Sequence, residues 1–366
     1  MVKVLVSNAT IMTFSMKEKM LIDEGFVFSD NGRIAVIGSG EPPEELRYPE
    51  LLLTGKERLI MPGFSSAFTN LSPYLLRYKE DSLDLSSNIE YMRKISRVDM
   101  YFLAAMAFAE MISRGVTTAL VVDIYLDEVA RAAHDLSFNV VLAPPINCGL
   151  EEFAPETELR LLLSRWHEKV EGIKAGIATC DEVDQKILSL AREHKLRIFQ
   201  IGGSVSEYEG VEVVFVNPSR GSGSNVIRWG PQLSVWRPEE GLGVGVRPSY
   251  DMRDVVRETS HKTFKHPIDI LYSAIVRNPI LIGFNDVGPL ERNLKTNLLM
   301  LNASEPPGWP LPKNLGGVTR AIVEGNLRIE TVILDDEILV DGGETMTIGS
   351  DLINKAKKRL ANLVKE

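Results

Sequence analysis

Between residues 99 and 202 the sequence alternates between two periodicities, and this alternation constrains the fold more than any other feature. Apolar residues recur at helix spacing over residues 99–114, where Met100, Leu103, Ala107 and Met111 share one stripe. Further helices are predicted at 126–135, 156–170 and 181–194, and strands at 117–123, 139–146, 173–179 and 197–202. Strands alternating with helices of about 10–15 residues are typical of parallel βαβ units. The pattern therefore predicts an α/β fold with a parallel sheet.

The alternation breaks after residue 202. A strand is predicted at residues 211–217, but Pro218 and the Gly/Ser-rich residues 219–224 after it disfavour a helix. Helices resume at 251–260 and 266–277. Residues 61–288 are also fewer than the roughly 250 typical of a (β/α)8 barrel. We therefore predict a trimmed (β/α)8 TIM-like barrel over residues 61–288, with at least one helix missing or shortened near residues 211–217.

Both ends of the chain are rich in β-strand patterns. Strands are predicted at residues 2–9, 25–29 and 33–37, with Asn31-Gly32 as a hairpin turn. After Gly288, strands are predicted at 297–301, 318–324, 327–334 and 337–340. We expect residues 1–60 and 289–348 to form one small composite β-sandwich domain into which the barrel is inserted, followed by a C-terminal helix at 349–366.

Charge and composition exclude several classes of function. The chain has 366 residues, with 41 Lys and Arg against 50 Asp and Glu, a net charge of −9. This acidic balance disfavours binding to nucleic acid or to an anionic membrane. No apolar run is long enough to span a bilayer, and the first eight residues are predicted as a strand rather than a signal peptide. Cys148 and Cys180 form no metal or redox motif, which suggests a reducing compartment, and we expect a cytoplasmic protein.

Several segments together resemble the amidohydrolase superfamily. Met61-Pro62-Gly63-Phe64 looks like the start of its barrel, and residues 110–118 (Glu-Met-Ile-Ser-Arg-Gly-Val-Thr-Thr) closely resemble a segment of the branch with cytosine and S-adenosylhomocysteine deaminases and triazine chlorohydrolases. Residues 140–146 and 288–301 follow in the order found in that branch. The resemblance implies a TIM-like barrel and metal-dependent hydrolysis of carbon–nitrogen bonds.

The metal-ligand motifs of that superfamily are missing. Its His-x-His pair, which would point to one side of the first barrel strand, corresponds to Phe68 and Asn70. The later histidines correspond to Gln200 and Asn217, and the final aspartate to Arg247, whose permanent positive charge would repel a divalent cation. The chain's histidines lie on predicted helices or at their edges, away from the strand ends. We therefore expect a divergent member with no catalytic metal and no cofactor.

Three functions remain open on this reading. The first is a metal-free pseudoenzyme, a scaffold for a ligand or a partner. The barrel mouth would then present Asn70, Gln200, Asn217 and Arg247, with Arg247 favouring a small anionic ligand. The alternative for the same four residues is that they satisfy one another where a metal once lay.

The second function is an active hydrolase of the deaminase or amidohydrolase type with displaced catalytic residues. Asp123, together with Tyr125, is its best candidate, although an aspartate there also fits a capping role. The third is a structural subunit that associates with another copy of itself or with an active paralogue.

Overall fold

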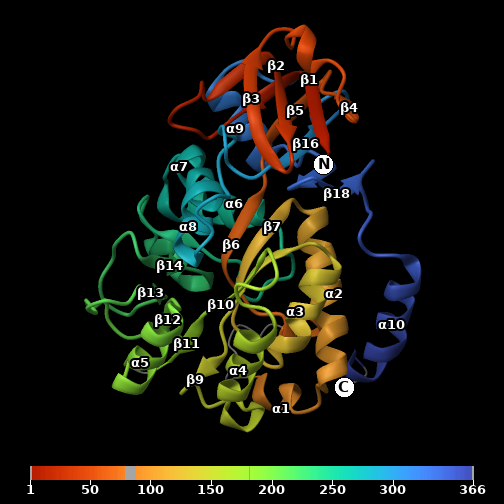
Figure 1. The fold of residues 1–366 in the computed structure, drawn as a ribbon. Helices are drawn as coiled ribbons and strands as arrows, with labels where there is room; N and C mark the ends of the chain where they lie inside the picture. Colours follow the sequence, from red (N-terminus) through yellow and green to blue (C-terminus); the bar gives the residue numbers. More distant parts are fainter. Residues whose placement is uncertain (1, 79–87, 181, 365–366) are drawn as a thin grey trace.

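The structure, a computed structural model, describes residues 2–78, 88–180 and 182–364. A sheet built from both ends of the chain lies at one end of the molecule (Figure 1). Parallel strands flanked by helices occupy the rest (Figure 1). Strand β5 (Arg58–Pro62) leads from the first part into β6 (Phe64–Thr69) of the second, so the parallel strands run away from the terminal sheet.

The terminal sheet has nine strands. The first sixty-two residues supply β1 (Lys3–Met12), β2 (Leu21–Asp30), β3 (Arg33–Ser39), β4 (Leu51–Thr54) and β5, and the return segment supplies β16 (Asn297–Asn302), β17 (Ile329–Leu334), β18 (Glu337–Asp341) and β19 (Glu344–Thr345). The two halves meet where β5 and β16 pair antiparallel, with Met61 opposite Leu299. Apolar residues of both halves share one cluster, which includes Ile11, Ile60 and Leu298. Hydrogen bonding makes this one sheet rather than the two sheets of a sandwich, and the domain boundaries stay a prediction.

One predicted strand of the return segment is wrong. Residues 318–324 belong to helix α9 (Leu315–Glu324). Asn314 caps this helix by accepting a hydrogen bond from the backbone N–H of Gly317 at 2.8 Å. Val318 and Ile322 are buried four residues apart, so the apolar residues of the segment follow helix spacing.

The parallel strands form two sheets that continue into each other. The first has the order β10-β8-β7-β6 and the second β15-β14-β13-β12-β11-β9. Their bounds are β7 (Val116–Val121), β8 (Asn139–Leu142), β9 (Pro145–Ile146), β10 (Ile173–Ala175), β11 (Ile177–Thr179), β12 (Ile198–Ile201), β13 (Val213–Val216), β14 (Val226–Arg228) and β15 (Gly241–Leu242). On the far side, a bridge joins Thr69 to Gly245, and the Gly245 N–H donates to the Phe68 carbonyl at 2.8 Å. The fold is therefore α/β and TIM-barrel-like, although the two sheets are not one continuous ladder.

Helices flank the parallel strands, most of them in the first half of the arrangement and the rest after the last strand. They are α1 (Ile89–Met92), α2 (Arg97–Ser113), α3 (Leu126–Asp135), α4 (Pro155–Arg165), α5 (Gln185–His194), and, after β15, α6 (Met252–Thr263), α7 (Pro267–Tyr272) and α8 (Asn278–Ile282). The connections at residues 202–212 and 217–225, both fully described, contain no helix. This agrees with the missing helix predicted near residues 211–217. The C-terminal helix α10 (Ser350–Val364) lies beside α2, where Arg359 pairs with Asp99 at 2.6 Å.

Alternate residues of the parallel strands face two different cores. On β7, Ala119 and Val121 belong to the large cluster that also contains residues of α2 and α3. Leu120 and the following Val122 belong to a second cluster, which contains none of the α2–α5 residues. Because strand side chains alternate in direction, the second cluster fills the space enclosed by the strands. We call it the interior cluster.

The prediction that the two cysteines indicate a reducing environment is not supported, because Cys148 and Cys180 form a disulfide with a Cα–Cα distance of 4.9 Å. They are 32 residues apart in sequence. Strands β9 and β11 pair in parallel, with Ile146 opposite Thr179, so the residues just beyond them lie side by side. Sequence spacing alone does not reveal that pairing. Separately, none of the helices in the described ranges is both long and apolar enough to cross a bilayer.

Removing the disulfide should lower stability. Cross-linking the ends of a loop of this size restricts the unfolded chain, and such bonds typically contribute about 2–4 kcal/mol. We expect the Cys148→Ala/Cys180→Ala variant to lose that much unfolding free energy in urea titrations. A reductant should lower the free energy of unfolding of the wild type and leave that of the variant unchanged. A wild type insensitive to complete reduction would contradict this expectation.

Candidate functional site at the carboxyl ends of the parallel strands

Two stacked aromatic rings fill the space where β6 ends. Phe68 is 1% exposed and stacks on Trp229, with ring centroids 5.1 Å apart and planes 20° apart. Two glycines make room for the pair. A Cβ on Gly243 would lie 2.7 Å from the Cβ of Phe68, and one on Gly245 would lie 2.2 Å from the Trp229 ring. Gly245 also has a φ of +64°, which side chains rarely adopt, so the aromatic stack depends on glycine at this position.

The stack belongs to the interior cluster, which is apolar throughout. It receives side chains from the strands or strand ends on all sides of the barrel-like arrangement. Its members are Ala67, Phe68, Leu120, Val122, Val141, Ala143, Ala178, Phe199, Val214, Val216, Ile227, Ile282, Phe284 and Val287, with Trp229, Ile201 and Leu281 packed against them. None of the fourteen core members carries a side-chain group that can coordinate a metal ion. Around the aromatic stack the enclosed space is therefore filled by packed apolar side chains.

Asn70 connects two strand ends rather than facing the enclosed space with a free amide. It is 1% exposed, and its Nδ2 donates to the Val122 carbonyl at 2.6 Å. Its own carbonyl accepts a hydrogen bond from the Tyr250 hydroxyl at 2.8 Å. These bonds tie the loop after β6 to the end of β7 and to the segment before α6.

Gln200 points away from the interior cluster. Its neighbour Phe199 belongs to that cluster. Ile198 belongs instead to the large cluster shared with α2 and α3, which we call the helix-facing core, and so does Phe215, the β13 residue opposite Gln200. Gln200 is 2% exposed and accepts a hydrogen bond from Tyr208 at 3.4 Å. Since no helix follows β12, Tyr208 of the connecting loop takes the covering position. The structure therefore does not bring Gln200 to the other three predicted site residues.

Asn217 positions the aromatic stack. Its Oδ1 accepts from the Trp229 backbone N–H at 2.9 Å, and its Nδ2 donates to the Trp229 carbonyl at 3.1 Å. Its φ of 49° is in the left-handed region that asparagine tolerates better than most residues. The amide thus bonds to the backbone of Trp229 on both sides and mimics a strand pairing.

Arg247 is the charged member of the predicted set. It forms an ion pair with Glu258 of α6, and its side chain is 17% exposed. Burial lowers the pKa of the Arg247 guanidinium. Nη1 is buried without a hydrogen-bond partner among the described residues. Arg247 is therefore the one predicted site residue with an unused polar atom of this kind.

Both carboxylate oxygens of Asp123, the candidate catalytic acid, accept hydrogen bonds from backbone N–H groups. Its Oδ2 accepts from the N–H groups of Leu71 and Ser72 at 2.7 and 2.8 Å, and its Oδ1 from that of Ile124 at 2.8 Å. Burial raises the pKa of this carboxyl group against the opposing effect of those donors. Tyr125 packs instead against Phe153, with the Arg97 guanidinium 5.1 Å from its ring. The contacts of Asp123 fit the capping role weighed for it.

The residues at this end do not fit a catalytic metal ion. Within the described ranges, no three His, Cys, Asp or Glu side chains are grouped so that they could hold one. A catalytic zinc site uses about three protein ligands. The positions matched to those ligands hold a buried aromatic ring, three amides bonded to neighbouring groups and an ion-paired guanidinium.

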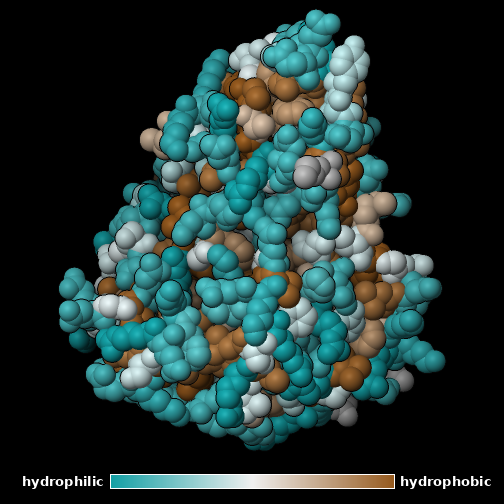
Figure 2. Space-filling view, in the orientation of Figure 1, coloured by the Kyte–Doolittle hydropathy of each residue, from teal (hydrophilic) through white to brown (hydrophobic). Residues whose placement is uncertain are grey.

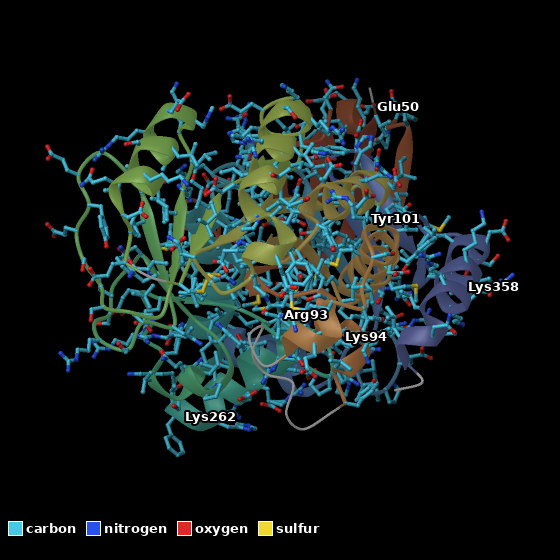
Figure 3. All side chains as sticks on the ribbon, turned by 90° about the horizontal axis from the view of Figure 1, so that it is seen from below. Glu50, Arg93, Lys94, Tyr101, Lys262 and Lys358 are labelled. Atoms are coloured by element: carbon cyan, nitrogen blue, oxygen red, sulfur yellow. A yellow bond between two sulfur atoms is a disulfide. The ribbon has the colours of Figure 1, made fainter. Side chains whose placement is uncertain are left out.

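The surface around this end is polar. Figure 3, which views the molecule from this side, shows Arg93 and Lys94 just after α1, and Arg93 pairs with Glu152 at 3.0 Å. On the face drawn in Figure 2, hydrophilic residues cover most of the surface and hydrophobic residues are scattered among them.

The chain is similar to curated deaminases. One, the 5-methylthioadenosine/S-adenosylhomocysteine deaminase of Desulfitobacterium hafniense (strain DSM 10664 / DCB-2), is 24% identical over 401 residues, covering 89% of this chain and 90% of the relative. The enzyme with the same name from Syntrophomonas wolfei is 29% identical over 181 residues, covering 46% of this chain but only 40% of that relative. No family model matches the chain.

A solved structure shows the same fold. The adenosine deaminase of Xanthomonas campestris, solved with bound zinc, superposes with a TM-score of 0.80 at 14% identity and covers 98% of both chains. In sequence and in fold the chain resembles enzymes of the amidohydrolase superfamily. Trp229, Gly243 and Gly245 form the interior with Phe68, although the sequence alone did not indicate them. The available signal was Trp229 itself, a large aromatic residue shortly after the apolar residues Val226 and Ile227.

Truncating the aromatic stack should strongly destabilise this protein. Phe68→Ala would leave a cavity against Trp229, and such changes cost about 3–5 kcal/mol. Phe264, which is 93% exposed, gives a matched control whose replacement by alanine should change stability by about 0.5 kcal/mol or less. Urea titration of both variants measures the difference. Equal effects would mean that the stack contributes no special stability.

Proposed function

We propose that this chain is a metal-independent scaffold of the amidohydrolase superfamily that no longer performs metal-dependent hydrolysis. The observation that carries the proposal is the Phe68–Trp229 stack within an apolar interior cluster. Hydrolysis of this type needs a water molecule activated by a cation, and the cation needs several donors around one point. Apolar side chains take up that point here, and Arg247 adds a positive charge nearby.

The ligand-binding role of Asn70, Gln200, Asn217 and Arg247 belongs to the same proposal in a narrower form. Three of the four polar side chains bond to neighbouring groups, which supports a structural role for them. Arg247 retains an unpartnered Nη1, so a small anionic group would bind through this guanidinium. A second copy of the chain or an active paralogue, each with a carboxylate at that point, is the corresponding macromolecular partner.

A second candidate function is hydrolysis of carbon–nitrogen bonds. The observation in its favour is the alignment over 89% of this chain with a relative named as a deaminase. Under this hypothesis the catalytic groups lie at positions other than those matched to the superfamily's ligands. Metal content and deamination separate the two candidates directly.

The deciding experiment is metal analysis of protein purified without chelators, joined to a deamination assay. We expect substoichiometric zinc, iron and nickel, and no ammonia release from 5-methylthioadenosine, S-adenosylhomocysteine or adenosine. A purified deaminase serves as the positive control, and a chelator should leave the melting temperature of this protein unchanged. Stoichiometric metal together with turnover that a chelator abolishes would establish the hydrolase instead.

The anion proposal is tested by thermal shift with small carboxylates and phosphates. A ligand at about 100 times its Kd adds about 2.7 kcal/mol to the stability of the folded state. That stabilisation should disappear in Arg247→Ala and persist in Arg220→Ala. Arg220 is exposed, and its replacement by alanine removes the same positive charge from the protein. Stabilisation that survives Arg247→Ala would place the anion elsewhere.

A further inference from the structure

A cavity lies at the opposite end of the parallel strands, beside the terminal sheet. Its volume is about 860 Å³, and it is lined by residues at the beginnings of β10, β12 and β13 and by Phe284, Asp286 and Lys295. This is within the range of about 300–1,000 Å³ of small-molecule sites. It is distinct from the carboxyl-end site described above.

Lys174 points into this end of the strands. Its neighbours Ile173 and Ala175 belong to the helix-facing core, so the side chain between them faces the enclosed side. Its Nζ donates to the Gly283 carbonyl at 2.6 Å and lies 4.5 Å from the centre of the Phe284 ring. No carboxylate of the described residues lies within ion-pair distance of Nζ, so this half-buried ammonium has two unused donors and no counter-ion.

Other cations around the cavity reinforce that charge. Lys295 pairs with Glu171 at 2.7 Å and Asp335 at 3.1 Å, and Arg197 pairs with Glu212. Burial lowers the pKa of Lys174, and Arg197 and Lys295 lower it further against the opposite effects of Asp286 and Glu168. Six basic and four acidic side chains line the cavity, so its excess charge is positive in a chain whose net charge is −9.

We propose that this cavity binds a small molecule bearing an oxyanion, a phosphate or carboxylate group, through the Lys174 ammonium. Partial burial of an ammonium without a counter-ion costs free energy, and an anion at hydrogen-bond distance offsets that cost. Arg197 and Lys295 are held by their own ion pairs. They add to the positive electrostatic potential of the cavity and do not make the primary contact with the anion. The inference is independent of the proposed function, because it concerns the other end of the strands and involves no reaction.

Isothermal titration with inorganic phosphate, and separately with citrate, tests the proposal at constant ionic strength in chloride. Lys174→Met keeps the aliphatic stem and removes the ammonium, and binding should weaken about tenfold or more. Lys174→Arg should retain binding. Lys265→Met is the matched control, since Lys265 is exposed and its loss changes the net charge equally. The two anions distinguish a phosphate site from a carboxylate site.

A measurement on the wild type keeps the proposal testable if Lys174→Met fails to fold. Saturating phosphate should slow the chemical acetylation of Lys174 and leave the acetylation of Lys265 unchanged. Peptide mass spectrometry measures both rates. Absence of saturable binding of either anion below roughly 10 mM, or equal binding by wild type and a folded Lys174→Met variant, would overturn the proposal.

Discussion

The contact between the end of β6 and the segment around Gly245 determines the rest of the barrel-like structure. The two backbones meet at the Thr69–Gly245 bridge, and their side-chain space is shared by Phe68 and Trp229. Gly243 and Gly245 lack the Cβ atoms that would collide with these rings, which permits both the backbone approach and the stack. Dense packing of this kind gives the interior a single arrangement, because neither ring can move without opening a void.

The polar residues around the stack maintain backbone geometry. Asn217 holds Trp229 through two hydrogen bonds, Asn70 holds the end of β7, and Asp123 holds the loop after β6. In an apolar surrounding each amide or carboxylate needs partners, and the backbone groups freed at strand ends provide them. The same residue types that bind ligands elsewhere are satisfied here by the protein itself. The opposite end differs, because Lys174 is half-buried among charges without a counter-ion of its own.

Much of the architecture was predictable because it depends on local patterns. Apolar periodicity located α2, α3 and α5 and the strands between them, and the Gly/Ser-rich segment after Asn217 indicated the missing helix. Sequence similarity to the superfamily rested on short segments such as residues 110–118. Residues 318–324 were predicted wrongly because Val318, Ile322 and Val323 fit either periodicity over so short a run, and the cap at Asn314 decided for the helix.

The sequence by itself determined the alternation of strands and helices, the β-rich ends and the absence of histidines from the positions matched to the superfamily's ligands, since each depends on short local segments. Only the tertiary structure decided that Gln200 faces the helix side, that Cys148 meets Cys180 and that Trp229 stacks on Phe68. These outcomes depend on strand register, and a shift of one residue reverses the side that every side chain faces. Register is fixed by packing among strands distant in sequence, so no local pattern reports it.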